Sequence, residues 1–138
     1  MSQINVDIVK LEQASRGFFE SRGIRVVNID GSVATLSMEI KPDELNPYGI
    51  VFGGDLYSLA DCAAQMAAHM DGRIYVTRSG NLSFLSNRDK GTVCAKATVL
   101  HRSNTLCLCN VLLTTEKEDI LAAGQFDCYA LAKGNKIL

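Results

Sequence analysis

The chain has 138 residues, of which 47% are hydrophobic and 21% charged, and its formal net charge is −1 at pH 7. The length suits one domain over residues 1–138, and the composition is that of an ordinary globular protein rather than a disordered or fibrous chain. A net charge so close to zero gives no reason to expect nucleic acid or an anionic membrane as a partner, and we expect neither.

The first predicted element is a surface helix over residues 4–20, where apolar residues recur at a loose helical spacing. Gly23 is expected to end this helix. A strand is predicted over residues 24–29, and the Asp30–Gly31 pair after it is typical of a hairpin turn. Residues 33–40 then alternate between apolar and polar, which is the pattern of a half-buried strand.

A loop over residues 41–52 leads to a predicted central helix over residues 54–70. Residues 54–72 contain no Lys, Arg or Glu. A helix this apolar must be buried on nearly all sides. Its remaining polar residues lie three or four positions apart and form one narrow stripe: Ser58, Asp61, Gln65 and His69. A solvent-facing stripe normally carries Lys and Glu, so we interpret this one as lining a cleft or an interface.

Four more strands are predicted after the central helix, over residues 74–85, 93–101, 105–115 and 120–131, with short polar turns between the last three. The order of elements is therefore helix, two strands, one apolar helix, four strands. This order predicts an α+β fold in which a curved antiparallel sheet wraps around one central helix, with an additional N-terminal helix. That arrangement is the hotdog fold.

The cysteines give no sign of a disulfide framework or a metal site. There are five, an odd number, and Cys107 and Cys109 fall on one face of a predicted strand. Reduced thiols used as small core residues are the simpler interpretation, so we expect a cytoplasmic protein without a metal. The N-terminal residues MSQINVDIVKLEQ lack the pattern of a signal peptide, and residues 56–70 are too short and too polar to span a bilayer.

Three short motifs stand together around the start of the central helix: Asn46-Pro47-Tyr48-Gly49, Phe52-Gly53-Gly54 and Leu59-Ala60-Asp61. Together they resemble the hotdog-fold PaaI-like (phenylacetic-acid-degradation type) acyl-CoA thioesterases. That family shows an Asn-x-x-Gly-x-x-His-Gly-Gly loop followed by a helix with Leu-Ala-Asp. The resemblance extends from about Gly23 to Leu131. Two residues depart from the family pattern: Phe52 stands in place of the usual His, and Asn87 in place of a common Pro.

The resemblance implies the roles of four catalytic residues. The backbone amide of Gly53 would polarise the thioester carbonyl, since amides at a helix start are unpaired and lie at the positive end of the dipole. Asp61 would activate water or attack the carbonyl directly. Asn46 would help to hold the carbonyl or the water, and Thr77 would be a hydroxyl partner of the carboxylate. A tight turn is the alternative interpretation of Gly53-Gly54.

The spacing of these residues has a consequence for assembly. Gly53 and Asp61 are eight residues apart, which is about 12 Å along a helix axis. One thioester carbonyl therefore cannot touch both within a single subunit. We expect a homodimer in which Gly53 of one chain meets Asp61 of the other, and the resemblance implies a dimer or a homotetramer built as a dimer of dimers.

The predicted substrate contacts lie on both sides of the helix start and in a basic segment. Gly54 would let the acyl group approach the backbone, and Phe52 would line an apolar pocket. Residues 73–102 contain six basic residues and one acid. This segment could be an ordinary solvated face or a binding site for the phosphates of coenzyme A. For the second interpretation, the residues that would contact coenzyme A are Arg88, Lys90, Arg102, Ser103 and Asn104.

The sequence therefore predicts an acyl-CoA thioesterase that hydrolyses an aryl or medium-chain acyl-CoA. Coenzyme A would be part of the substrate, and no bound cofactor is expected. A hotdog hydratase would need a catalytic His where this chain has Phe52. The alternative from another class is a non-catalytic module that binds acyl-CoA.

Overall fold

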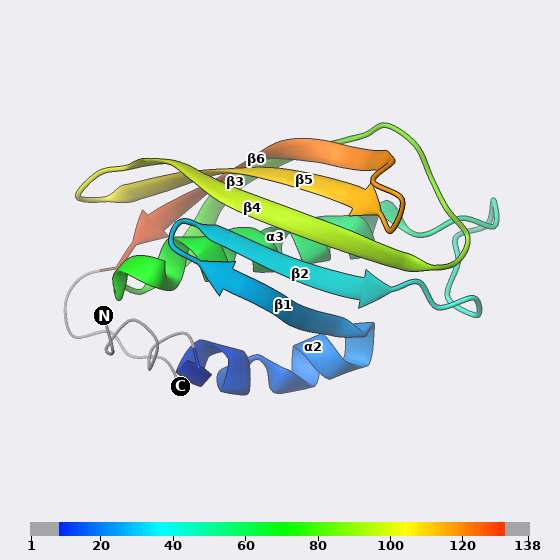
Figure 1. The fold of residues 1–138 in the computed structure, drawn as a ribbon, viewed down its shortest axis with the longest axis horizontal. Helices are drawn as coiled ribbons and strands as arrows, with labels where there is room; N and C mark the ends of the chain where they lie inside the picture. Colours follow the sequence, from blue (N-terminus) through cyan, green and yellow to red (C-terminus); the bar gives the residue numbers. More distant parts are fainter. Residues whose placement is uncertain (1–8, 132–138) are drawn as a thin grey trace.

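The computed structural model describes residues 9–131 and consists of one six-stranded antiparallel sheet and the helices it packs against (Figure 1). The strand order is β1-β2-β4-β5-β6-β3, so β1 and β3 are the two edges. The strands are β1 (Ile24–Asp30), β2 (Val33–Glu39), β3 (Tyr75–Phe84), β4 (Thr92–Arg102), β5 (Leu106–Thr115) and β6 (Ile120–Ala130).

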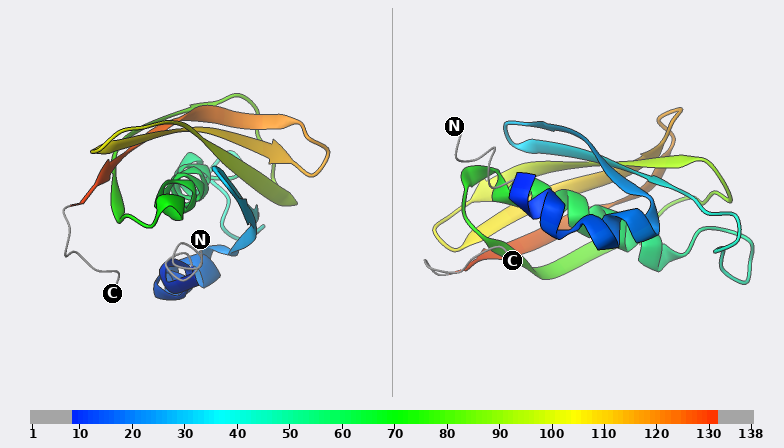
Figure 2. Two further views of the ribbon diagram at one scale, coloured as in Figure 1. Left: turned by 60° about the vertical axis from the view of Figure 1, so that its left-hand side comes forward. Right: turned by 90° about the horizontal axis from the view of Figure 1, so that it is seen from below.

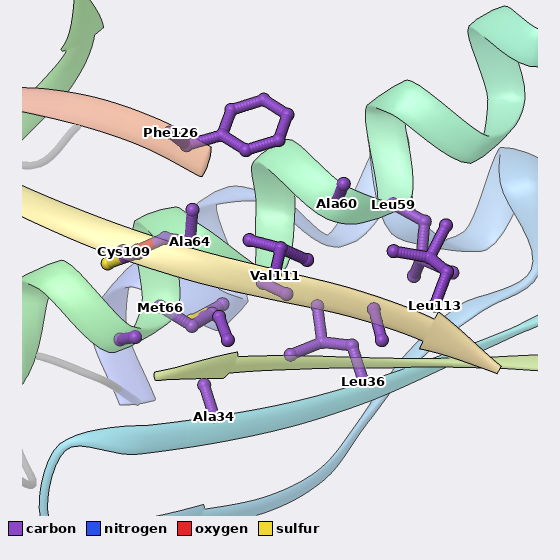
Figure 3. Close-up of a cluster of buried hydrophobic side chains, with 14 of the residues drawn as sticks. Ala34, Leu36, Leu59, Ala60, Ala64, Met66, Cys109, Val111, Leu113 and Phe126 are labelled. Atoms are coloured by element: carbon purple, nitrogen blue, oxygen red, sulfur yellow. The ribbon is translucent and has the colours of Figure 1, made fainter. Parts of the chain in front are cut away.

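The central helix α3 (Gly53–Ala68) lies in the hollow of the curved sheet, as the left-hand view of Figure 2 shows. A short 3-10 turn, His69–Asp71, continues it. Eight of its residues are buried, five of them alanines, and these small side chains let the helix sit close to the strands. The inward side chains of β2, β5 and β6, such as Leu36, Leu113 and Phe126, close around it (Figure 3).

The predicted elements agree with the structure in type and order, and this arrangement is the hotdog fold that the sequence predicted. Each strand boundary lies within one residue of its predicted position. Helix α2 (Arg16–Arg22) and the helical residues 9–14 before it confirm the later part of the predicted N-terminal helix. The start of that predicted helix lies outside the described residues.

The alternation of side chains along a regular strand predicts that the polar residues of β3 and Tyr75 share one face, namely Tyr75, Thr77, Ser79, Asn81 and Ser83. The structure departs from this expectation. The pairing of β3 with β6 shifts by one residue between Thr77 and Ser79, so that Arg78 is an extra residue in the strand. Such a β-bulge moves every later side chain to the opposite face. The expectation is therefore wrong for the last three residues.

The partners on β6 show which face each part of β3 occupies. Thr77 pairs with the buried Cys128, and therefore points towards α3, whereas Ser79 pairs with the half-buried Asp127 on the outer face. Gly80 then takes the inward position. A Cβ atom there would overlap the Tyr57 hydroxyl oxygen and lie 2.6 Å from the Phe126 ring. Only glycine therefore fits where Tyr57 crosses the strand.

Candidate active site

The loop before α3 is held by the side chain of Asn46. Its Oδ1 accepts hydrogen bonds from the backbone N–H groups of Tyr48 (2.9 Å) and Ile50 (3.2 Å). Gly49 has a φ of 78°, which closes this turn and which a larger residue would adopt only with strain. Because Oδ1 is occupied in this way, the side-chain N–H groups are the part of Asn46 left to meet a ligand.

Helix α3 begins on the two glycines without any side chain to cap it. Phe52 is the N-cap residue, in an extended conformation (φ −63°, ψ 135°), and it makes no side-chain cap. The first amide bonded within the helix is that of Asp55, which donates to the Phe52 carbonyl at 3.1 Å. The amides of Gly53 and Gly54 precede it, at the positive end of the helix dipole. This is the place where a developing oxyanion would be stabilised.

The two glycines are not required by the backbone conformation, since neither has a positive φ. A Cβ on Gly54 would have no atom within 4 Å, and one on Gly53 would lie 3.2 Å from the Phe84 ring at the end of β3. Gly54 therefore opens onto unfilled space. The interpretation of this pair as a tight turn is wrong, because both residues are helical.

The carboxylate of Asp61 lies two turns further along the same helix and faces the beginning of β3. Its Oδ1 is 2.5 Å from the Thr77 hydroxyl, which donates to it. Burial raises the pKa of Asp61, and the hydrogen bond from Thr77 opposes this only in part. The structure thus brings together two of the predicted residues. Asp61, Gln65 and His69 of the polar stripe all have partners on β3, whereas the Ser58 hydroxyl donates to the Gly54 carbonyl within the helix.

Gln65 joins this pair one turn below Asp61. Its amide nitrogen lies 3.1 Å from the Tyr75 carbonyl, and its Oε1 lies 3.0 Å from the Thr77 N–H and 2.7 Å from the Thr77 hydroxyl. We assign the amide this way because the opposite orientation would set nitrogen against N–H and oxygen against carbonyl. The sequence identified Gln65 only as a member of the stripe. Its spacing of four from Asp61 was the signal that could have linked the two residues.

The far end of α3 is closed by a network around Asp71. Arg102 donates to the carbonyls of Ala68 (2.8 Å) and Ala67 (3.0 Å), and its Nη1 lies 3.0 Å from Asp71 Oδ2. Burial works to raise the pKa of Asp71, but hydrogen bonds from Tyr75 and Arg73 and the charge of Arg102 outweigh it and lower this pKa. Arg102 was predicted to contact coenzyme A. In the structure its Nη1 and Nη2 groups instead make contacts within the fold, where they cap the end of α3.

The other predicted coenzyme A contacts lie at two ends of the subunit. Arg88 and Lys90 precede β4, and Ser103 and Asn104 follow it. The eleven residues of β4, at about 3.3 Å each, separate the two groups by more than about 30 Å. Within one chain they cannot hold one nucleotide together.

Each of these two groups lies beside one end of α3. The carbonyl of Arg88 accepts from the Val51 N–H at 2.9 Å, which places its loop next to the helix start. The carbonyls of Ser103 and Asn104 accept from Arg73 at 3.0 and 2.8 Å, which places their turn beyond the helix end. Gly53 and Asp61 are likewise separated, by about 12 Å along the axis of α3.

Comparison with known proteins identifies the family. A model of the thioesterase superfamily matches residues 48–122, more than half of the chain. The chain belongs to the thioesterase superfamily. The acyl-coenzyme A thioesterase PaaI of Escherichia coli is 27% identical over 101 residues, with 72% of each chain covered. A putative esterase of Mycobacterium tuberculosis is 26% identical over 114 residues, covering 78% of this chain and 81% of that protein.

The solved structures agree with this assignment. The structure of E. coli PaaI matches with a TM-score of 0.80 at 22% identity, covering 91% of this chain and 96% of that one, and this likeness concerns the fold. A variant of the phenylacetic acid degradation protein PaaI from Thermus thermophilus matches with a TM-score of 0.78 at 26% identity, covering 83% and 99%. The PaaI-like resemblance of the three motifs is confirmed.

Two further features bear on what the site could bind. Over residues 9–131, no three His, Cys, Asp or Glu side chains are grouped so that they could hold a metal ion. Among the described helices, none has the length and apolar character needed to cross a membrane.

Proposed function

We propose that this protein is an acyl-CoA thioesterase that hydrolyses an aryl or medium-chain acyl-CoA to the free acid and coenzyme A. The observation that carries the proposal is the half-buried Asp61, held by Thr77 at 2.5 Å on the same helix whose first amides are left open at Gly53 and Gly54. The names of two relatives agree with it: the E. coli acyl-coenzyme A thioesterase, and a Listeria monocytogenes 1,4-dihydroxy-2-naphthoyl-CoA hydrolase that is 26% identical over 108 residues.

In the proposed reaction Asp61 is the general base. It takes a proton from a water molecule as the water oxygen adds to the thioester carbonyl carbon. The negative charge that develops on the carbonyl oxygen is stabilised by the Gly53 N–H and by the side-chain amide of Asn46. The C–S bond then breaks, and the proton passes to the departing thiolate. We favour this route over direct attack because burial makes Asp61 more basic, and Thr77 already occupies one carboxylate oxygen.

The site is proposed to form between two copies of the chain that pair through β3. This strand is an edge of the sheet, and paired edges leave no open backbone groups. Gly53 lies against Phe84 at the end of β3, whereas Asp61 is bonded to Thr77 at its beginning. An antiparallel pair of β3 strands would therefore place Gly53 of each copy near Asp61 of the other.

Exposed apolar side chains support an interface at this place. Phe52, Phe84 and Leu85 are 46%, 52% and 60% exposed, and all three lie around the start of α3 and the end of β3. Exposed apolar residues that gather in one patch are typical of an interaction surface. A second copy would cover them, and two such dimers could associate further into a tetramer.

The same pairing would unite the two groups of predicted coenzyme A contacts. The loop with Arg88 and Lys90 lies at the Gly53 end, and the turn with Ser103 and Asn104 at the other end of α3. In an antiparallel dimer the first group of one copy faces the second group of the other. We propose that the nucleotide lies between them and that Arg102 acts indirectly, by holding the turn in place.

The free thiols support a cytoplasmic location within this proposal. All five cysteines are unpaired, and three of them are buried in the core. Reduced cysteines of this kind are usual in a reducing compartment.

A direct assay tests the proposed function. Purified protein is incubated with acetyl-, medium-chain and aryl-CoA esters in the presence of a chromogenic thiol reagent, and thiol release is followed. We expect catalytic release with at least one aryl or medium-chain ester. Saturable binding of these esters without thiol release from any of them would contradict the proposal and favour a non-catalytic acyl-CoA-binding module.

A further inference from the structure

The Thr77 hydroxyl lies within hydrogen-bond distance of two other oxygen atoms, and it has only one proton to donate. Thr77 Oγ1 lies 2.5 Å from Asp61 Oδ1 and 2.7 Å from Gln65 Oε1. Both distances are those of hydrogen bonds between oxygens, yet a threonine hydroxyl has one proton to donate. An amide oxygen and an ionised carboxylate can only accept. One of the two contacts is therefore left without a proton whenever Asp61 is ionised.

Both hydrogen bonds of Thr77 Oγ1 can form when Asp61 carries a proton. The carboxyl group then donates to Thr77 Oγ1, and the Thr77 hydroxyl donates to Gln65 Oε1. Gln65 cannot turn away from the Thr77 hydroxyl, because both polar atoms of its amide bond to the backbone of β3. The amide nitrogen donates to the Tyr75 carbonyl at 3.1 Å, and Oε1 accepts from the Thr77 N–H at 3.0 Å. The Gln65 oxygen is thus held where it competes with Asp61 for the Thr77 proton.

We propose that Gln65 is a positioning residue that draws the Thr77 hydroxyl proton away from Asp61, so that the carboxylate becomes a stronger base for the attack of water. This inference rests on the proposed function for its consequence in catalysis, but the proton arrangement itself does not depend on turnover. A general base works best when its pKa approaches the pH at which the enzyme operates. Gln65 would bring Asp61 closer to that condition without touching the substrate.

The other titratable groups around Asp61 do not explain the same effect. Cys62 follows it on α3 and Cys128 faces it from β6, and the charge of Arg22 at the end of α2 acts on the Cys62 thiol. Burial, together with neighbouring negative charge, raises the pKa of both thiols to about 12. Both thiols therefore stay neutral over the range in which a carboxyl group titrates.

The test is a pH titration of the Asp61 side-chain carbon by NMR, with Asp61→Asn used to assign its signal among the 15 acidic residues. Gln65→Met keeps the length of the side chain and removes the competing oxygen. The proposal predicts that the Asp61 midpoint moves to lower pH, since the hydroxyl can then donate to the carboxylate alone. A more apolar neighbour would by itself move the midpoint to higher pH, so the sign of the shift decides.

Three controls make the result specific. In the Thr77→Val background, Gln65→Met should no longer lower the Asp61 midpoint, because the proposed effect of Gln65 requires the hydroxyl; only the rise caused by a more apolar neighbour should remain. Ser58→Ala removes a hydroxyl from the same helix that donates to the Gly54 carbonyl at 3.0 Å, and it should not move the midpoint. The pH at which kcat/KM falls on the acid side should follow the NMR midpoint in Gln65→Met.

A measurement that needs no Gln65 variant covers the case in which Gln65→Met does not fold. The Gln65 side-chain carbonyl carbon should titrate with the Asp61 midpoint in the wild-type protein and lose this response in Thr77→Val. An upward shift in Gln65→Met, or an unchanged response of the carbonyl carbon in Thr77→Val, would overturn the proposal. A downward shift in a protein that hydrolyses no acyl-CoA would instead uphold the proton arrangement and contradict the proposed function.

Discussion

The two ends of helix α3 differ in how their polar groups are satisfied. At the far end, the charged side chains have partners within the chain: Arg102 caps the last carbonyls, and Asp71 receives Arg73, Tyr75 and Arg102. At the near end the helix starts on Gly53 and Gly54 with no side-chain cap and with an exposed Phe52 beside them. The polar groups at the C-terminal end of α3 are satisfied within the chain, whereas the first amides at its N-terminal end have no side-chain cap.

This difference fits the proposed function, in which one end of α3 stabilises the fold and the other end binds the substrate. Asp61 lies between the two ends and belongs to the closed part, because Thr77 and Gln65 hold it against β3. The open amides lie about 12 Å away. If catalysis needs both the Asp61 carboxylate and an open amide at the helix start, it therefore requires two copies of the helix. One copy would supply the carboxylate and the other the amide.

The largest effect is expected at Asp61, in the part of α3 that is held against β3. Asp61→Asn keeps the shape of the side chain and removes the base, so steady-state hydrolysis of the best acyl-CoA should fall by more than about 100-fold. Circular dichroism and acyl-CoA binding should stay as in the wild type.

The matched control is the other acid on the helix. Asp55→Asn lies in the first turn, where an acid only complements the helix dipole, and should keep most of the activity. An Asp61→Asn enzyme that turns over nearly as fast as the Asp55→Asn control would remove Asp61 from the mechanism.

A smaller effect is expected at the open end. Gly54→Ala puts a methyl group where no protein atom lies within 4 Å, so the fold should tolerate it and the free energy of unfolding should stay the same or rise by up to about 1 kcal/mol. If the acyl group approaches the backbone here, kcat/KM should fall about tenfold, equivalent to about 1.4 kcal/mol in the barrier.

Gly17→Ala provides the comparison for this variant. Gly17 lies in α2, also with no atom within 4 Å of an added Cβ, and far from the proposed site along the chain. The free energy of unfolding should change in Gly17→Ala as it does in Gly54→Ala, while kcat/KM should stay at the wild-type value. Equal activity in the two variants would show that Gly54 does not face the substrate.

The smallest effect concerns Phe52, the N-cap residue of α3. Phe52→His restores the side chain common in the family and adds a hydrogen-bond donor beside the open amides. We expect the ranking of acyl-CoA substrates by kcat/KM to change while activity remains. Tyr48→His alters a more exposed ring in the preceding loop, 88% exposed against 46% for Phe52, and should preserve the ranking. An identical ranking in wild type and Phe52→His would mean that Phe52 does not line the pocket.

Most of the fold could be predicted from the sequence because its signals are local. The alternation of residues 33–40 requires one buried face, and Ala34, Leu36 and Met38 are buried. The absence of Lys, Arg and Glu from residues 54–72 requires a helix buried on most sides, and only Gly54 and Tyr57 of α3 are exposed. The bulge at Arg78 could not be placed by alternation, because a one-residue insertion leaves the pattern on either side intact. Gly80, inside a strand, was the available hint.

The site was less predictable, since its contacts join distant parts of the chain. The pairing of Asp61 with Thr77 was expected from the family resemblance, and the structure places the two together. The role of Arg102 as a helix cap and the packing of Phe84 against Gly53 depend on how the sheet curves around α3, which no local pattern records. The separation of Arg88 from Ser103 follows from the length of β4 and could have been counted from the predicted strand.

The shared site is tested most directly by mixing two inactive variants. Asn46→Ala damages the amide side of each site and Asp61→Asn the carboxylate side, so each homodimer has two defective sites. After co-unfolding and refolding an equal mixture, a heterodimer would contain one site with both defects and one with neither. We expect activity to return in proportion to the heterodimer fraction measured by native mass spectrometry, up to about a quarter of the wild-type value for random pairing. If heterodimers form and no activity returns, both groups act within one chain and the two-copy account is wrong.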